Sequence, residues 1–174
     1  MPIVLLAGAA MIGLFLLLAL FGGKGGPTET APNSSGPRAE GPWIWRLSPD
    51  AFEKLLQRLF TAMGLEVERS EVRREIVDLV VRDPAPISGG RIFVRGILHA
   101  DAGMVQQAEV QAALDLARGE ATVKALVLSP MGFSAEARLA VARTVCELVD
   151  GEGLIELLRQ RLPEVLESAG AGYV

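Results

Sequence analysis

Cysteine and histidine are almost absent from this sequence, and their scarcity narrows the chemistry that the chain can carry. The 174 residues contain one cysteine, Cys146, and one histidine, His99. One cysteine excludes an internal disulfide, and a lone histidine cannot form a metal site by itself. A Ser-His-Asp arrangement would have to use His99, but no Gly-x-Ser-x-Gly motif accompanies it. The glycines of DPAPISGG (83–90) stand outside any phosphate-binding motif, so this segment is interpreted as a turn.

Charge is absent from the first part of the chain. Residues 2–21 contain no charged side chain, and a helix of that length spans about 30 Å, the thickness of a bilayer's hydrocarbon core. A cleaved signal peptide would need a positive n-region and an Ala-x-Ala-like exit, and both are missing. A buried core helix would not be uniformly apolar on every face at the extreme N-terminus. Residues 1–22 are therefore predicted to form a transmembrane helix.

A polar segment follows the apolar one. Residues 23–42 are mostly Gly, Pro, Ser, Thr and Ala, a composition that cannot bury enough apolar surface to fold, so they are predicted to be a flexible linker. Lys24 and Arg38 lie on this side of the apolar span, and no lysine or arginine precedes it. The positive-inside bias then places the C-terminal domain in the cytoplasm, as in a single-pass protein of a bacterial-type inner (cytoplasmic) membrane.

The rest of the chain, residues 43–174, is acidic. It holds 15 Lys and Arg (17 minus Lys24 and Arg38) against 19 Asp and Glu (21 minus Glu29 and Glu40). Strong non-specific binding of nucleic acid normally comes with a basic surface, and the bulk charge argues against it here.

Arginines nevertheless gather in the middle of this region. They could form a DNA-contacting surface, for which the candidates are Arg73, Arg74 and Arg91. They could instead form a solvated face, paired with the nearby Glu66, Glu68, Glu71 and Glu75. The sequence leaves both interpretations open and favours the second.

A helix is predicted near the start of the domain. Ser48 is a suitable N-cap and Pro49 a suitable first residue, and apolar residues recur at helical spacing as far as Met63, before Gly64. Residues 65–69 then alternate as a half-exposed strand would. Trp43 and Trp45 are expected to pack in a strand at the start of the domain.

Helices and strands alternate in the second half of the domain. The predicted elements are a helix over 101–118, a strand over 124–129, a helix over 135–143, a strand over 145–149, a helix around 154–158 and a short helix from Pro163. Strands separated by single helices require right-handed crossovers and a mixed sheet covered by helices. The sequence therefore predicts an α/β three-layer domain over residues 43–162, followed by a short helix and a tail over 163–174.

The centre of the domain is the stretch 76–98. Two β-branched runs, 76–81 and 91–98, flank DPAPISGG, which is typical of two antiparallel strands joined by an irregular loop. Asp78 lies inside the first run, where a charged side chain is costly unless it has a partner. Arg95, on the second run, is the candidate partner.

Four segments carry a family resemblance in their order. They are LSPDAFEKLLQRLFTAMGLEVERS (47–70), VDLVV (77–81), KALVLSPMGFSAEARLAVA (124–142) and CELVDGEGLIELL (146–158). Together they resemble Mrr-like type IV restriction endonuclease domains of the PD-(D/E)xK nuclease superfamily. The resemblance covers residues 47–158. It implies a restriction-endonuclease-like fold, Mg²⁺-dependent DNA cleavage, and Asp78 as the first catalytic aspartate and metal ligand.

The chain departs from the family pattern in the strand that follows Asp78. The family carries Gln or Glu, one residue, then Lys, because two ligands hold Mg²⁺ and the lysine positions or activates water. Aligned on RIFVRGIL (91–98), these positions read Val94 and Gly96. A shift of one residue puts Phe93 and Arg95 there and turns the side chains to the other face of the sheet. An arginine stays protonated and cannot serve as a base.

Glu53 is the remaining candidate for a second carboxylate, because it matches a position that in the family can lie near the site. Asp78, Glu53 and Arg95 would then be the catalytic set of a divergent enzyme. His99 and Asp101 could add ligands only if the end of the strand curled back. Mg²⁺ requires several oxygens in near-octahedral order, and Asp78 with one remote glutamate is a poor set.

We therefore expect a membrane-anchored domain without nuclease activity and without a cofactor, which binds or scaffolds another protein, a second copy of the chain, or DNA. Two alternatives remain open at this point. One is a divergent, Mg²⁺-dependent DNA endonuclease of the type IV restriction (defence) class. The other is a DNA-binding domain that does not cleave.

Overall fold

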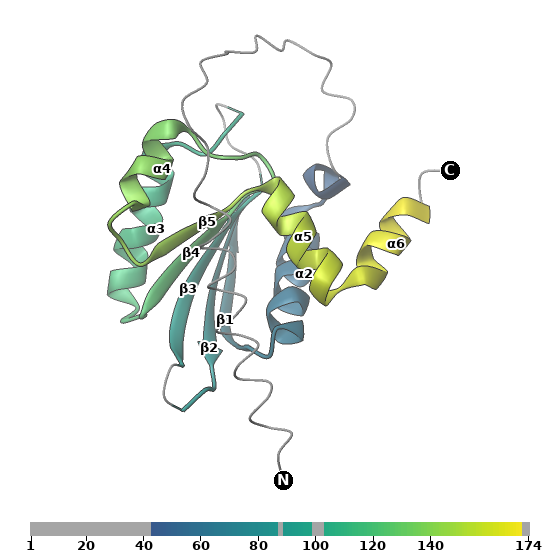
Figure 1. The fold of residues 1–174 in the computed structure, drawn as a ribbon, viewed down its shortest axis with the longest axis horizontal. Coiled ribbons are helices and arrows are strands. Elements are labelled where there is room, and N and C mark those ends of the chain that lie inside the picture. The colour runs from purple at the N-terminus through teal and green to yellow at the C-terminus, as the bar shows by residue number, and fades with distance from the viewer. Residues whose placement is uncertain (1–42, 87–88, 99–102, 172–174) are drawn as a thin grey trace. The chain divides into compact units, whose positions relative to one another are not determined.

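A five-stranded sheet between two layers of helices forms the folded part of the chain (Figure 1). The structure is a computed structural model that describes residues 43–86, 89–98 and 103–171. Its strands are β1 (Glu66–Arg73), β2 (Ile76–Asp83), β3 (Gly90–Ile97), β4 (Lys124–Leu128) and β5 (Cys146–Val149). Its helices are the 3₁₀ helix η1 (Trp43–Arg46), α2 (Pro49–Ala62), α3 (Gln107–Gly119), α4 (Ala135–Val141), α5 (Gly151–Arg161) and α6 (Pro163–Ala171). The predicted α/β class with a mixed sheet is confirmed.

The strands lie in chain order across the sheet, β1-β2-β3-β4-β5. The pairs β1–β2 and β2–β3 are antiparallel, whereas β3–β4 and β4–β5 are parallel. Parallel neighbours require a crossover, and α3 and α4 supply the two that this sheet needs.

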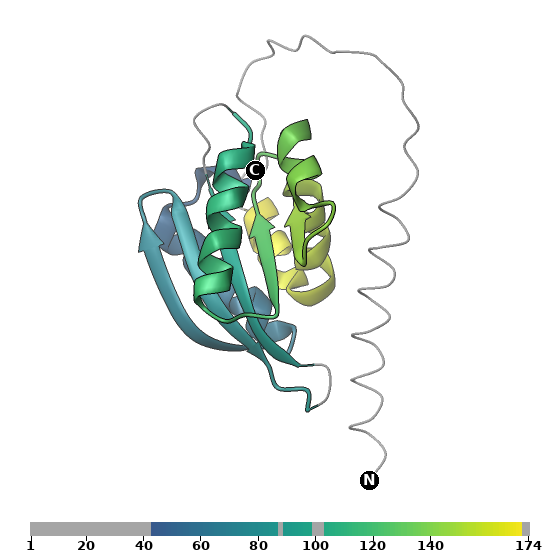
Figure 2. The same cartoon turned by 90° about the vertical axis from the view of Figure 1, so that its left-hand side faces the viewer.

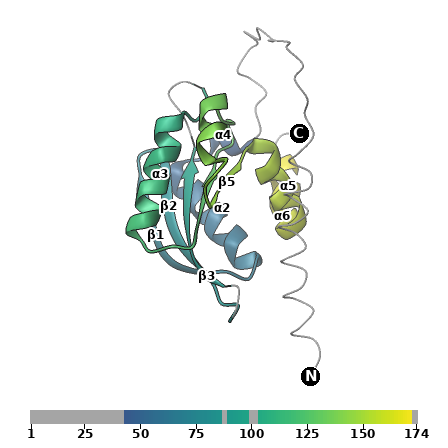
Figure 3. The same ribbon diagram turned by 60° about the vertical axis from the view of Figure 1, so that its left-hand side comes forward.

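The helices divide into two groups. Helices α3 and α4 pack against each other on one side of the sheet, and α2, α5 and α6 lie on the other side (Figures 1 and 3). Helix α3 contacts β3 and β4, while α2 contacts β1 and β2 from the opposite face. The β1–β2 hairpin extends beyond α3 (Figure 2), so part of the sheet on the α3 side carries no helix in the described chain.

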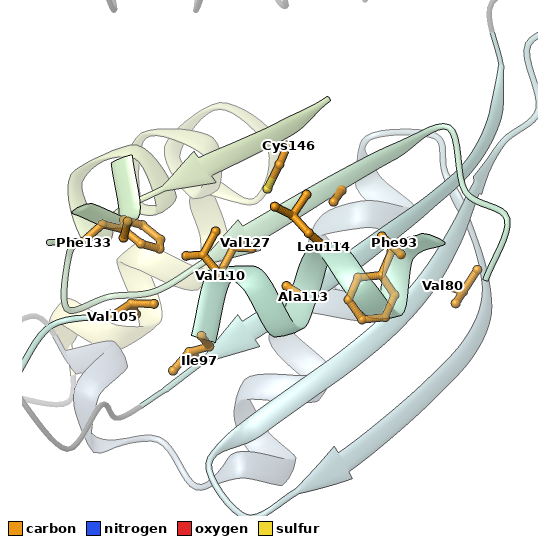
Figure 4. Packing of buried hydrophobic residues seen from close by; sticks show 13 residues of the cluster. Val80, Phe93, Ile97, Val105, Val110, Ala113, Leu114, Val127, Phe133 and Cys146 are labelled. Atoms are coloured by element: carbon orange, nitrogen blue, oxygen red, sulfur yellow. The ribbon is translucent and has the colours of Figure 1, made fainter. Parts of the chain in front are cut away.

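Apolar residues fill the space between α3 and the sheet. Val80 of β2 and Phe93 and Ile97 of β3 belong to one buried cluster with Val110 and Ala113 of α3 (Figure 4). Because side chains alternate along a strand, this cluster shows which residues of β2 and β3 face α3. Residues one position away face α2.

Helix starts agree with the predicted caps. The Ser48 hydroxyl accepts a hydrogen bond from the backbone N–H of Ala51 at 3.2 Å, and the Ser134 hydroxyl accepts one from Ala137 at 3.1 Å. Asp150 caps α5 in the same way. These bonds satisfy backbone donors that a helix leaves free in its first turn.

Of the predicted elements, three differ most from the structure. The helix predicted over 101–118 begins only at Gln107, because Gln106 and Glu109 form a capping box, so the described residues 103–106 precede it. The strand predicted over 65–69 begins at Glu66 and continues to Arg73, since it pairs with β2 from Ile76 to Arg82. The predicted strand at Trp43 and Trp45 is wrong: these residues form η1, held where the Trp45 indole donates to the Pro130 carbonyl oxygen at 3.0 Å.

Several predictions fall on parts of the chain outside the described residues. These are the transmembrane helix over 1–22, the linker over 23–42, and the possible ligands His99 and Asp101. Within 43–86, 89–98 and 103–171, no helix combines the length and the apolar character that a bilayer crossing requires.

Candidate functional site

A bidentate ion pair joins Asp78 of β2 to Arg95 of β3. The two residues are directly opposite in the antiparallel register. Arg95 Nε donates to Asp78 Oδ1 and Arg95 Nη2 donates to Asp78 Oδ2, both at 2.7 Å. Only 8% of the Arg95 side chain and 11% of the Asp78 side chain are exposed. The predicted partner of Asp78 is confirmed, and the fork-to-fork geometry is the strong form of this contact.

The pair lies on the α3 side of the sheet. Asp78 lies two residues before the buried Val80 on β2, so the two side chains share one face of the sheet. Arg95 lies between Phe93 and Ile97 on the same face of β3. Val80, Phe93 and Ile97 all belong to the cluster under α3. The Arg95 guanidinium carbon lies 5.9 Å from the centroid of the Phe93 ring. An aromatic face at that distance adds favourable contact for the cation.

Charged residues of β1 lie next to the pair, on the side of Asp78. Glu71 is directly opposite Asp78 in the β1–β2 register, so Glu71, Asp78 and Arg95 form a row across three strands. Arg73 Nε donates to Glu71 at 2.7 Å, and this bond lowers the pKa of the Glu71 carboxyl. Arg69 makes its ion pair with Glu120 at the end of α3. Glu120 and Glu71 thus form the close ion pairs of Arg69 and Arg73 and raise the pKa of each guanidinium, and Asp78 adds a smaller electrostatic attraction to both.

Val94 and Gly96 face away from Asp78. Gly96 is opposite Val77, and a Cβ atom built on Gly96 would lie 2.7 Å from Leu56 and 2.8 Å from Phe52 of α2. The alignment that puts the family's ligand and lysine at these two positions is therefore wrong for a site shared with Asp78. The shifted alignment lies on the correct face, because side chains alternate along β3.

On Asp78's face, β3 presents Arg91, Phe93, Arg95 and Ile97, of which the last three lie beside Asp78. A ligand-x-Lys motif on this face would read either Phe93-Val94-Arg95 or Arg95-Gly96-Ile97, and neither offers an oxygen ligand.

Glu53 is not brought to Asp78. It lies on α2, where its carboxylate accepts hydrogen bonds from the Ser70 hydroxyl and from Gln57 at 3.1 Å. Ser70 is opposite Leu79, on the α2 side of the sheet. The sheet therefore separates Glu53 from Asp78, and the two predicted carboxylates do not form one site. Ser70 was not a candidate in the sequence, because no motif links it to a residue seventeen positions earlier in the chain.

The three predicted DNA-contacting arginines do not form one patch. Arg73 ends β1 and Arg74 occupies the tight turn to β2, where its φ is 55°. Arg91 lies at the other end of the sheet, about 20 Å away at ~3.3 Å per strand residue. There it donates to Glu68 at 2.8 Å and to the Glu120 carbonyl oxygen at 2.7 Å. The interpretation as a paired, solvated face describes Arg73 and Arg91, although Glu120 had not been among the predicted partners.

The described residues do not fit a Mg²⁺ ion. Both Asp78 oxygens accept N–H groups of Arg95, β3 offers no second carboxylate on that face, and Glu71, the carboxylate opposite Asp78 on β1, is held by two hydrogen bonds from Arg73. Throughout the described ranges, no group of three or more His, Cys, Asp and Glu side chains is arranged to hold a metal. Mg²⁺ needs near-octahedral oxygen coordination, which this arrangement does not provide.

A family model and two solved structures match the chain. The family model, Mrr_cat, is described as a restriction endonuclease and matches residues 44–158. The structure of the DNA modification-dependent restriction endonuclease AspBHI is similar at a TM-score of 0.51 and 11% identity, over 84% of this chain and 45% of that one. The MspJI restriction endonuclease in complex with a 27-mer oligonucleotide gives a TM-score of 0.40 and 16% identity, over 68% and 31%.

The chain thus spans less than half the length of either similar structure. At these identities the likeness to AspBHI concerns the fold alone. Comparison with curated protein sequences finds no match.

Proposed function

This chain belongs to the Mrr_cat restriction endonuclease family, and from that premise we propose that it is a non-cleaving member, a membrane-anchored domain that acts as a binding or scaffolding module. The observation that carries the proposal is the Asp78–Arg95 pair. The aspartate that would hold a metal is neutralised by a buried guanidinium at 2.7 Å on both oxygens. Each oxygen of that carboxylate already accepts a guanidinium hydrogen bond, and the positive charge of Arg95 beside it opposes the binding of a cation.

The missing partners of Asp78 support the same proposal. A Mg²⁺-dependent nuclease needs a second oxygen ligand and a basic group beside the first. Beside Asp78, β3 offers Phe93, Arg95 and Ile97 on this face, Glu71 of β1 is paired with Arg73, and Glu53 lies on the other face of the sheet. No step of DNA hydrolysis is therefore assigned to these residues.

The apolar segment 1–22 supports the anchoring part of the proposal. Its length and its lack of charge suit a single transmembrane helix, and Lys24 and Arg38 favour a cytoplasmic domain. Candidate partners of the domain are another protein, a second copy of the chain, or DNA held without cleavage. The acidic balance of residues 43–174 favours a protein partner over non-specific DNA.

Cleavage of DNA is the direct test. The full chain, purified in detergent, is incubated with unmodified and with base-modified plasmid in the presence of Mg²⁺ or Mn²⁺. We expect no nicking or linearisation at any protein concentration at which an active restriction endonuclease cuts to completion. Reproducible cleavage that disappears in Asp78→Ala would overturn the proposal.

Anchoring is tested separately. We expect the full chain to stay in the membrane pellet after alkaline carbonate extraction and to leave it only with detergent. A variant that lacks residues 1–22 should appear in the soluble fraction. Recovery of the full chain in the carbonate supernatant would contradict the anchor and would leave the statement about cleavage unaffected.

A further inference from the structure

Helices α2 and α5 lie on the same side of the sheet (Figure 3), and a hollow lies between α2 and the junction of α5 with α6. Its volume is about 540 Å³, within the range of about 300–1,000 Å³ that is usual for small-molecule sites. We propose that this hollow binds a phosphate monoester with a small organic group. The residues that line it are Lys54, Gln57, Arg58, Thr61, Ala62 and Leu162.

Helical spacing brings the polar lining together. Lys54, Arg58 and Thr61 are four and three residues apart on α2, so their side chains follow one another along one face of the helix. They supply an ammonium, a guanidinium and a hydroxyl, and each of these groups donates hydrogen bonds. Two of the three are positively charged. The ligand that suits this lining is therefore an anion.

Lys54 and Thr61 are available to such a ligand. Lys54 is exposed, and its ammonium forms no hydrogen bond or ion pair with any residue that the structure describes. Asp50, one turn earlier on α2, leaves it unpaired, and Glu53 is occupied by Ser70 and by a neighbouring glutamine. The Thr61 hydroxyl also has no partner within 43–86, 89–98 and 103–171.

Arg58 already holds one anionic group. Its Nη2 donates to Glu164 Oε1 of α6 at 3.2 Å, and both side chains are 58% exposed. An ion pair as exposed as this one contributes little to stability, because solvent screens it. A ligand with more negative charge can therefore displace the carboxylate. Glu164 shows that an anion fits beside Arg58, and it competes with a ligand for that guanidinium.

The charge of the hollow favours a phosphate monoester. Once Glu164 is displaced, Lys54 and Arg58 carry two positive charges, and a phosphate monoester carries close to two negative charges at neutral pH. The arginine fork can bind two phosphate oxygens, and the lysine adds a point charge. Ala62 and the buried Leu162 offer apolar surface to the organic group. For a small ligand in a hollow whose cations are exposed, the dissociation constant should be on the order of 1 mM.

The experiment measures binding of phenyl phosphate to the full chain in detergent, by saturation-transfer NMR at neutral pH. We expect saturable binding at the affinity given above. Inorganic phosphate and benzoate are then added as competitors. Both should displace phenyl phosphate only at several-fold higher concentration, because the first lacks the organic group and the second carries a single charge. If benzoate competes as well as unlabelled phenyl phosphate, the assignment to a phosphate monoester is wrong.

Two variants test the cations of the hollow. Lys54→Gln and Arg58→Gln should each weaken the binding of phenyl phosphate at least about tenfold, the usual effect of losing a hydrogen bond to a charged group. Both positions are exposed, so the variants should fold. The matched control is Arg118→Gln on α3, which removes another exposed, ion-paired arginine and should leave the affinity unchanged.

A third variant predicts the opposite sign. Glu164→Gln removes the competing carboxylate and should tighten the binding of phenyl phosphate several-fold. Its control is Glu167→Gln, which makes the same change of charge on α6 at a residue that does not pair with Arg58. No saturable binding to the wild-type chain, or equal binding by wild type, Lys54→Gln and Arg58→Gln, would overturn the proposal. So would equal affinities of Glu164→Gln and Glu167→Gln.

The hollow lies on the opposite face of the sheet from Asp78 and Arg95. Its occupancy therefore goes beyond the proposed function and does not depend on it. The binding measurements involve neither DNA nor a metal, so their failure would leave the cleavage and anchoring tests unaffected.

Discussion

Asp78 and Gly96 lie on neighbouring strands, one residue out of register, and point to opposite faces of the sheet. Asp78 lies on the side of α3, and Gly96 lies under Phe52 and Leu56 of α2. Different interactions therefore determine which residues the two positions can hold. Position 78 is governed by charge, and position 96 by the space between β3 and α2.

The first prediction concerns that space. Gly96→Ala places a Cβ atom 2.7 Å from Leu56 Cδ1 and 2.8 Å from Phe52 Cε1, and overpacking of this kind costs about 1–3 kcal/mol. The free energy of unfolding, from urea denaturation, should fall by that amount. The control is Gly119→Ala, because nothing lies within 4 Å of a Cβ atom there. Equal stabilities of the two variants would contradict the packing described for α2.

The second prediction concerns the ion pair. Asp78→Asn leaves the buried guanidinium without its counter-charge and should lower the stability by about 3–5 kcal/mol. The double variant Asp78→Asn/Arg95→Gln carries no charge and should recover part of this loss. Arg73→Gln breaks the exposed pair with Glu71 and should leave the stability nearly unchanged, because solvent screens that pair. If Asp78→Asn is as mild as Arg73→Gln, the pair is not buried as described.

The third prediction tests the structural role of Glu53. If its carboxylate serves to hold the Ser70 hydroxyl, Glu53→Met, which removes the acceptor, and Ser70→Ala should each cost about 1 kcal/mol. Their double variant should cost less than the sum, since both remove one interaction. Strictly additive losses would show that Glu53 and Ser70 act independently.

The fourth prediction concerns the thiol. Burial raises the pKa of Cys146 to about 11, with a smaller contribution from Glu147. A raised pKa means less thiolate, and at pH 8 the thiolate fraction is about 0.1%, against about a quarter for a free thiol of pKa ~8.5. Iodoacetamide should therefore modify the folded chain at least ~100-fold more slowly than glutathione. The rate should rise about tenfold per pH unit between pH 8 and 10, and it should match glutathione in urea. Fast labelling of the folded chain at pH 8 would contradict this environment.

The clearest local patterns in the sequence predict the structure well. Ser48 and Ser134 begin helices because their hydroxyls satisfy backbone donors, and that requirement is local in the chain. The start of α3 was misplaced because its cap is Gln106, which is not among the usual N-cap residues. The role of Trp45 depends on Pro130, eighty-five residues away, and no local pattern contains that contact.

The candidate site was only half predictable for a similar reason. Asp78 needs a cation, and Arg95 was the nearest choice on the next strand. The register determines which β3 side chains share the face of Asp78, and the loop sequence after Asp83 does not predict that register. The separation of Glu53 from Asp78 could not be foreseen either, because it depends on which side of the sheet α2 packs.

The Asp78–Arg95 pair also bears on how the two strands find their correct alignment. A slip of β3 by two residues would keep every apolar side chain on its proper face. It would, however, bring Asp78 opposite Phe93 or Ile97 instead of Arg95, and two buried charges would then lack partners. Such a state is strongly disfavoured. The ion pair therefore favours the observed register of β2 and β3 in folding. This structural role requires both Asp78 and Arg95 and does not depend on any binding of nucleic acid.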